Sequence, residues 1–205
     1  MAQALSVGSG GLRETNRIMR VIAGKFRSRL LKGPGKLRLR PTSDRLRETL
    51  FNILGAAVED SWFVDVYAGT GAIGIEAVSR GAREVIFVES HAATAKLIRA
   101  NLASLKINSG VEIIEASALR GLERIAQRHL IADFIFLDPP YENEQELLEV
   151  LDYLDASHVV APRGLVIVEH RKRTELPERL DRLERTRLLE QGDAALSFYR
   201  LAAAA

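Results

Sequence analysis

The sequence contains no cysteine among its 205 residues. Disulfide bonds and thiolate metal sites are therefore excluded, and a reducing cytoplasm is the compartment that fits best. The sequence also lacks any apolar run near the roughly 18 residues of a membrane-spanning helix, and the N-terminus has no secretory hydrophobic region. The four histidines are scattered without the spacing of metal ligands, so we expect no metal site and no membrane association.

Acidic residues are nearly absent from one segment. Residues 13–47 contain twelve Lys or Arg against two acidic residues, Glu14 and Asp44, so this segment carries a charge of +10. Since the whole chain carries +2, the remainder carries −8. A solvated surface does not require this separation of charge, whereas an arm that binds a polyanion does. We therefore expect nucleic-acid contacts from Arg20, Lys25, Arg27, Arg29, Arg38, Arg40, Arg45 and Arg47.

The chain divides into three parts. Residues 1–18 are rich in Gly and Ser and have no hydrophobic pattern, which predicts a disordered extension. Residues 19–57 form a basic arm that ends in a helix, for which Ser43 is a suitable N-cap and which runs from Asp44 to about Ala57. Residues 58–203 form the main domain.

Hydrophobic periodicity predicts alternating strands and helices in the main domain. The arm is expected to contribute two short strands before a turn at Gly33-Pro34-Gly35. Expected strands are 19–24, 26–32, 62–66, 84–89, 111–115, 131–137, 164–169, 185–190 and 196–201; expected helices follow 62–66 up to Arg80 and cover 92–105, 119–128 and 145–154. Such alternation indicates an α/β fold with a parallel, doubly wound sheet. The last two strands flank a Gly192-Asp193 turn and predict a hairpin that adds an antiparallel strand at one edge.

A glycine-rich turn follows the strand at 62–66. Gly69 and Gly71 allow the backbone to turn tightly and to approach a bulky ligand, and Glu89 ends the next strand, where its carboxylate can accept both ribose hydroxyls. With Gly74 the motif also reads G-x-G-x-x-G, which is typical of a dinucleotide-binding site and leaves an NAD-dependent oxidoreductase as an alternative. Against it, Asp65 just before the glycines would repel a pyrophosphate but attract the cationic end of S-adenosylmethionine.

The tetrapeptide Asp138-Pro139-Pro140-Tyr141 directly follows the apolar strand at 131–137. Two consecutive prolines fix φ and donate no hydrogen bonds, so their carbonyls and the preceding carboxylate are held in place. In-plane acceptors beside a flat aromatic ring suit a planar group that bears an NH2. Methyltransferases that modify the exocyclic amines of nucleobases carry this motif.

The two motifs and the run from Arg40 to Asn52, R-P-T-S-D-R-L-R-E-T-L-F-N, support a specific resemblance. From Met19 to the C-terminus the chain resembles the bacterial 16S ribosomal RNA guanine-N2 methyltransferases that modify guanine 966 of the small subunit. These are class I enzymes, so the resemblance implies a Rossmann-like, mostly parallel seven-stranded sheet and S-adenosylmethionine as cofactor. It makes 58–203 the methyltransferase domain and 19–57 an RNA-binding arm.

The resemblance also implies roles for individual residues. Ser117 stands where related enzymes often place Asp or Asn, and it can still accept a hydrogen bond from the adenine amine. The implied cofactor-binding residues are Asp65, Tyr67, Ala68, Gly69, Thr70, Gly71, Glu89, Ser117 and Ala118, and the implied catalytic residues are Asp138, Pro139, Pro140 and Tyr141.

The resemblance implies methyl transfer to the exocyclic N2 of a guanine in 16S ribosomal RNA, by a monomer acting on a small-subunit particle in the cytoplasm. Asp138 would hold the target amine, and Tyr141 would stack on the looped-out base. A methyltransferase that modifies adenine N6 in DNA or RNA remains an alternative, because it shares the Asp-Pro-Pro-Tyr motif. The chain has no segment large enough for the separate target-recognition domain that a DNA enzyme would carry.

Overall fold

A seven-stranded sheet forms the centre of the protein in the computed structural model, which describes residues 19–33, 43–140 and 143–203. The strand order is β5-β4-β3-β6-β7-β9-β8, and neighbouring strands from β5 to β7 run parallel. The strands are β3 (Trp62–Val66), β4 (Glu84–Glu89), β5 (Val111–Glu115), β6 (Ala132–Leu137), β7 (Val160–Arg171), β8 (Leu183–Gln191) and β9 (Ala194–Leu201). The predicted α/β, Rossmann-like fold is confirmed.

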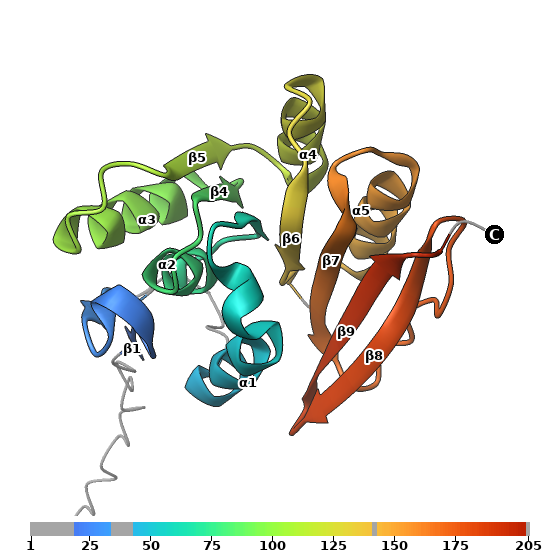
Figure 1. Ribbon diagram of the computed structural model, residues 1–205, viewed down its shortest axis with the longest axis horizontal. Helices are drawn as coiled ribbons and strands as arrows, with labels where there is room; N and C mark the ends of the chain where they lie inside the picture. Colours follow the sequence, from blue (N-terminus) through green and yellow to red (C-terminus); the bar gives the residue numbers. More distant parts are fainter. Residues whose placement is uncertain (1–18, 34–42, 141–142, 204–205) are drawn as a thin grey trace, which may run out of the picture.

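Helices cover both faces of this sheet (Figure 1). The helices are α1 (Asp44–Leu54), α2 (Ala72–Ser79), α3 (Ala92–Ser104), α4 (Ala118–Gln127) and α5 (Glu144–Ala156). Side chains along β4 alternate between two separate cores: Val85 and Phe87 pack with α1, α2 and α3, whereas Ile86 and Val88 pack with α4 and α5. Because successive side chains of a strand point to opposite faces of the sheet, a continuously apolar strand contributes side chains to both cores.

The C-terminal hairpin completes one edge of the sheet. β9 pairs antiparallel with both β7 and β8, so the antiparallel strand lies one place inside the edge and β8 is outermost. The chain reverses between them at Gly192, whose φ of +64° places it in the left-handed region. The predicted hairpin is therefore confirmed, and its strands extend further than the sequence pattern indicates.

The N-terminal strands differ from the prediction. β1 (Met19–Arg20) and β2 (Leu30–Leu31) pair antiparallel over two residues each, and a 3-10 helix, η1 (Gly24–Phe26), lies between them. The chain therefore reverses at this 3-10 helix, and both strands are shorter than expected. The expected turn at 33–35 lies largely outside the described residues. The reason is tertiary: the backbone N–H groups of Ile22 and Ala23 donate to the Glu76 carboxylate in place of a strand partner.

The first helix begins as expected and ends early. The Ser43 hydroxyl accepts a hydrogen bond from the Leu46 backbone N–H at 3.1 Å, which confirms the predicted N-cap. The α-helix ends at Leu54 and not at Ala57, because Gly55 adopts a φ of +57°. A short 3-10 turn, η2 (Gly55–Val58), then leads into β3. Within the part of the chain that the structure describes, no helix is long and apolar enough to cross a membrane.

Candidate active site

The carboxyl ends of the neighbouring strands β4, β3 and β6 lie side by side at one end of the sheet. Val66 is the register partner of Val88 on one side and of Leu137 on the other. Glu89 and Asp138, each one residue further along its own strand, therefore flank the loop that begins at Tyr67. The chain order reverses between β3 and β6, and such a switch point is where open α/β sheets bind ligands. The structure thus brings the cofactor and catalytic motifs together.

The glycine loop makes a tight turn between β3 and α2. Tyr67, Gly69 and Gly71 all have positive φ, at +62°, +54° and +77°. A Cβ on Gly71 would lie 3.1 Å from the Ile98 side chain, so glycine is favoured by both conformation and space. The third glycine of the motif, Gly74, serves packing instead, because a Cβ there would lie 2.2 Å from the Phe87 ring.

Glu89 has a structural role that the sequence did not reveal. Its carboxylate is buried, with an exposed fraction of 6%. One oxygen accepts a hydrogen bond from the Gly69 backbone N–H at 3.0 Å, and the other accepts from the His91 backbone N–H at 2.8 Å. The His91 Nδ1 also lies 3.3 Å from the second oxygen. A carboxylate offers about four acceptor positions, so these contacts leave capacity for a ribose hydroxyl. Glu89 therefore shapes the loop, and its expected contact with ribose stays a prediction.

Asp65 lies beneath the same loop and is nearly inaccessible, with an exposed fraction of 2%. Its Oδ2 accepts a hydrogen bond from the Gly74 backbone N–H at 2.9 Å. The pKa of Asp65 is raised to about 8, chiefly by burial. The Gly74 hydrogen bond opposes this rise, and the negative charge of Glu89 contributes to it. A buried carboxylate with this pKa favours a nearby cation, because the cation stabilises its ionised form.

The Asp-Pro-Pro segment follows β6 directly. Asp138 is partly exposed, Pro139 is buried and Pro140 is exposed, while Tyr141 lies outside the described residues. A small hollow beside the prolines is also lined by Glu169, His170 and Arg171 of β7. No motif in the sequence points to these three residues. Their position follows from the parallel pairing of β6 with β7, which no local pattern encodes.

The last expected cofactor residues lie at the end of β5. Ser117 is exposed and is the N-cap residue of α4, although its hydroxyl makes no capping hydrogen bond. Ala118 is the first residue of that helix and is buried. Because β5 neighbours β4, both residues lie at the same edge of the sheet as Glu89. Their expected contacts with adenine stay a prediction.

The expected RNA-contact residues fall into three groups. Five are exposed, namely Arg20, Lys25, Arg27, Arg29 and Arg45. Arg38 and Arg40 lie outside the described residues. The prediction for Arg47 is wrong, because its side chain is fully buried. Its Nη2 donates to the Arg20 carbonyl at 2.5 Å and to Asp44 at 3.1 Å, so Arg47 joins α1 to β1 within the arm and is not available to RNA.

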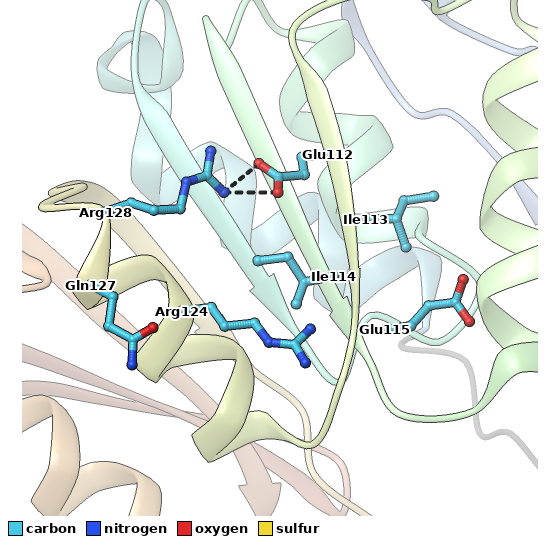
Figure 2. Close-up of a pocket in the computed structure, with 7 residues that line it drawn as sticks. All are labelled: Glu112, Ile113, Ile114, Glu115, Arg124, Gln127 and Arg128. Atoms are coloured by element: carbon cyan, nitrogen blue, oxygen red, sulfur yellow. Dashed lines mark hydrogen bonds and ion pairs between the residues drawn. The ribbon is translucent and has the colours of Figure 1, made fainter.

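A second, larger hollow lies at the β5 edge of the sheet, between β5 and α4 (Figure 2). It has a volume of about 420 Å³ and is lined by charged residues of both signs. Arg128 donates to both oxygens of Glu112 across it, at 2.8 Å each. None of the expected catalytic or cofactor-binding residues lines this hollow, so size alone does not locate the candidate active site.

A family model described as "Conserved hypothetical protein 95" matches residues 19–200. The chain belongs to this family. It is 36% identical over 185 residues to Ribosomal RNA small subunit methyltransferase D of Haemophilus influenzae, which covers 89% of this chain and 92% of the relative. It is 35% identical over 159 residues to the protein of the same name from Escherichia coli K12, 78% of each chain.

A solved structure shows the same fold. The Escherichia coli protein yhhF superposes with a TM-score of 0.80 at 30% identity, covering 91% of this chain and 99% of that one. The family resemblance read from the sequence is therefore confirmed. The oxidoreductase interpretation of the glycine motif loses its support, because the curated relatives of this family carry methyltransferase names.

Proposed function

We propose that this protein transfers a methyl group from S-adenosylmethionine to the exocyclic N2 of a guanine in 16S ribosomal RNA. The observation that carries the proposal is the placement of Asp138 next to the glycine loop, with the carboxylates of Asp65 and Glu89 on the neighbouring strands. Relatives named as small-subunit ribosomal RNA methyltransferases support the substrate class.

The residues of the loop fit this cofactor better than a dinucleotide. S-adenosylmethionine carries an ammonium group and a sulfonium on its methionine part, and a ribose with two hydroxyls between the sulfonium and the adenine. Asp65, buried and with a raised pKa, favours the cationic end, and Glu89 has acceptor capacity for the ribose. A pyrophosphate would instead face two carboxylates. The bound cofactor supplies a methyl group that its sulfonium already activates.

The work left to the protein is alignment and exclusion of water. The Asp138 carboxylate accepts a hydrogen bond from the guanine N2 amine, and the Pro139 carbonyl accepts a second. These acceptors draw the nitrogen lone pair out of conjugation with the ring and direct it along the transfer axis. Tyr141 stacks on the looped-out base. Asp138 need not be a strong base, since nitrogen gives up a proton readily once methylation has made it cationic.

Guanine suits these acceptors better than adenine does. The guanine Watson–Crick edge places the N1–H and N2–H2 donors side by side, and an ionised carboxylate is an acceptor with two oxygens. Adenine presents an acceptor at N1 beside its amine, which faces a carboxylate unfavourably. The N6-adenine alternative is therefore less favoured, and product analysis separates the two.

The exposed cations of the arm supply the contact with RNA. Lys25, Arg27 and Arg29 lie on the segment between β1 and β2, where they neutralise phosphates and release counterions. We further propose that residues 19–57 act as the RNA-binding arm of a methyltransferase domain at 58–203. In this proposal a monomer acts on a small-subunit particle in the cytoplasm.

The deciding experiment is product identification. The protein is incubated with methyl-labelled S-adenosylmethionine and either 16S ribosomal RNA or small-subunit particles from cells that lack the modification. The RNA is then digested to nucleosides, and the labelled species is identified by mass. We expect N2-methylguanosine, with Asp138→Ala as the inactive control. Label in N6-methyladenosine, or label in duplex DNA and none in 16S ribosomal RNA, would overturn the proposal.

A further inference from the structure

Asn101 of α3 joins the glycine loop to the basic arm. It is fully buried. Its Nδ2 donates to the Thr70 carbonyl at 3.0 Å and to the Lys32 carbonyl at 3.2 Å, and its Oδ1 accepts from the Lys32 backbone N–H at 2.8 Å. One side-chain amide therefore holds both backbone groups of a residue in the arm and one carbonyl of the loop.

Other contacts hold the arm without reaching the loop. The Glu76 carboxylate accepts from the backbone N–H groups of Ile22 and Ala23, at 2.7 Å and 3.0 Å. The Ser79 hydroxyl accepts from the Phe26 backbone N–H at 2.9 Å and donates to the Ala23 carbonyl. Among the hydrogen bonds of the described residues, those of Asn101 alone contact both the arm and the loop at 67–71.

The burial of Asn101 makes the two segments depend on each other. In a buried site, each polar group left without a hydrogen-bond partner costs about 1–3 kcal/mol of stability. A displacement of the Thr70 carbonyl therefore disfavours the Asn101 orientation that pairs with Lys32, and the reverse also holds. A ligand that fixes the position of the Thr70 carbonyl therefore also favours this position of Lys32 in the arm.

We propose that Asn101 is a positioning residue that couples occupancy of the glycine loop by S-adenosylmethionine to the position of the basic arm. This inference rests on the proposed function, because it requires a cofactor at the loop and RNA at the arm. Coupling between two binding sites is reciprocal. Cofactor therefore raises the affinity for RNA by the same factor as RNA raises the affinity for cofactor, which favours formation of the complete complex.

The test measures the affinity for a 16S ribosomal RNA transcript with and without saturating S-adenosylhomocysteine, the demethylated cofactor, at one fixed salt concentration. For the wild type we expect roughly tenfold tighter RNA binding with the cofactor, within the usual range of coupling factors. Asn101→Leu keeps the branched shape of the side chain and removes the three hydrogen bonds, so its factor should fall to about one. The reciprocal titration, cofactor binding with and without RNA, must give the same factor.

Ser79→Ala is the matched control, because it removes arm contacts that do not reach the loop. It should weaken RNA binding and leave the coupling factor unchanged, whereas a purely structural role for Asn101 would make the two variants alike. A wild-type factor of one, or an Asn101→Leu factor equal to that of the wild type, overturns the inference. Absence of S-adenosylhomocysteine binding to the wild type would instead refute the proposed function, and the coupling with it.

A second measurement needs no variant and covers the case in which Asn101→Leu does not fold. Trypsin cleaves after Lys25, Arg27, Arg29 and Lys32, all of which are exposed on the arm. Saturating S-adenosylhomocysteine should slow cleavage of the wild-type arm several-fold, with cleavage after Arg187 on β8 as the internal reference. Equal rates of arm cleavage with and without the cofactor contradict the coupling.

Discussion

The Oε2 atom of Glu89 accepts a hydrogen bond from the backbone N–H of Gly69 at 3.0 Å. Glu89, the last residue of β4, therefore holds the glycine loop that follows β3 by a hydrogen bond within the protein itself. This arrangement gives one carboxylate two tasks, since the same group is the proposed anchor for ribose. Substitutions at Glu89 are expected to affect the loop and the cofactor together.

Replacing Glu89 tests this double role. Glu89→Ala should weaken S-adenosylmethionine binding by about 1–3 kcal/mol, because it leaves the Gly69 N–H and the ribose hydroxyls without their acceptor. The melting temperature should also fall. Glu115→Ala is the matched control, since Glu115 ends the neighbouring strand but is exposed; it should leave the affinity unchanged. Calorimetry and thermal unfolding measure both effects, and an unaltered Glu89→Ala affinity would remove Glu89 from the cofactor site.

Asp138→Ala separates binding from chemistry. Asp138 is proposed to act on the base in the transition state, so its loss should lower kcat by at least about a hundredfold. The cofactor affinity should stay within about twofold of the wild type, since the proposed cofactor anchors Asp65 and Glu89 lie on β3 and β4. Single-turnover kinetics and calorimetry are the measurements. A variant that loses cofactor affinity and keeps its single-turnover rate would reverse the assignment.

The raised pKa of Asp65 predicts a pH-dependent cofactor affinity. Because the pKa is about 8 in the folded protein, Asp65 is mostly protonated at pH 6, and a cationic ligand must displace that proton. Affinity for S-adenosylmethionine should therefore rise with pH up to about 8. The cofactor's own amine titrates in this range too, so Asp65→Asn is the control that retains only that contribution. Calorimetry from pH 6 to 9 measures the slopes, and identical slopes would exclude Asp65.

The same pKa predicts an effect on folding. In the unfolded chain Asp65 has the ordinary aspartate pKa of 3.8, whereas in the folded protein its pKa is about 8. Between about pH 4 and pH 8 the folded state therefore binds one proton that the unfolded state does not. The contribution of Asp65 to stability is complete below about pH 4 and is lost as the pH rises towards 8. Denaturant unfolding of the wild type and Asp65→Asn measures this. Their difference in free energy of unfolding should change with pH in that window and be constant above it.

The strands and both motifs could be predicted because each depends on local pattern. Apolar runs predict the ends of β3, β4, β5 and β6 to within one residue. Ser43 is recognisable as an N-cap because its hydroxyl can accept a hydrogen bond from the first turn of α1. The missed features depend on residues far apart in sequence. Arg47 looks like another cation of the basic segment, yet α1 places it against the Arg20 carbonyl. Asn101 is an ordinary helix residue until the fold sets it between Thr70 and Lys32.

Arg45 and Arg47, two residues apart on α1, provide a matched pair for testing the proposed RNA-binding arm. Arg45 is exposed, so Arg45→Ala should weaken RNA binding and reduce the salt slope by about one, with no change in stability.

Arg47 is buried and bonded to the Arg20 carbonyl. Arg47→Ala should lower the free energy of unfolding by roughly 1–3 kcal/mol, and any loss of RNA affinity should follow only from unfolding of the arm. RNA titrations from 50 to 200 mM salt, paired with denaturant unfolding, compare the two. Equal loss of affinity in a stably folded Arg47→Ala would mean that this arginine contacts RNA after all.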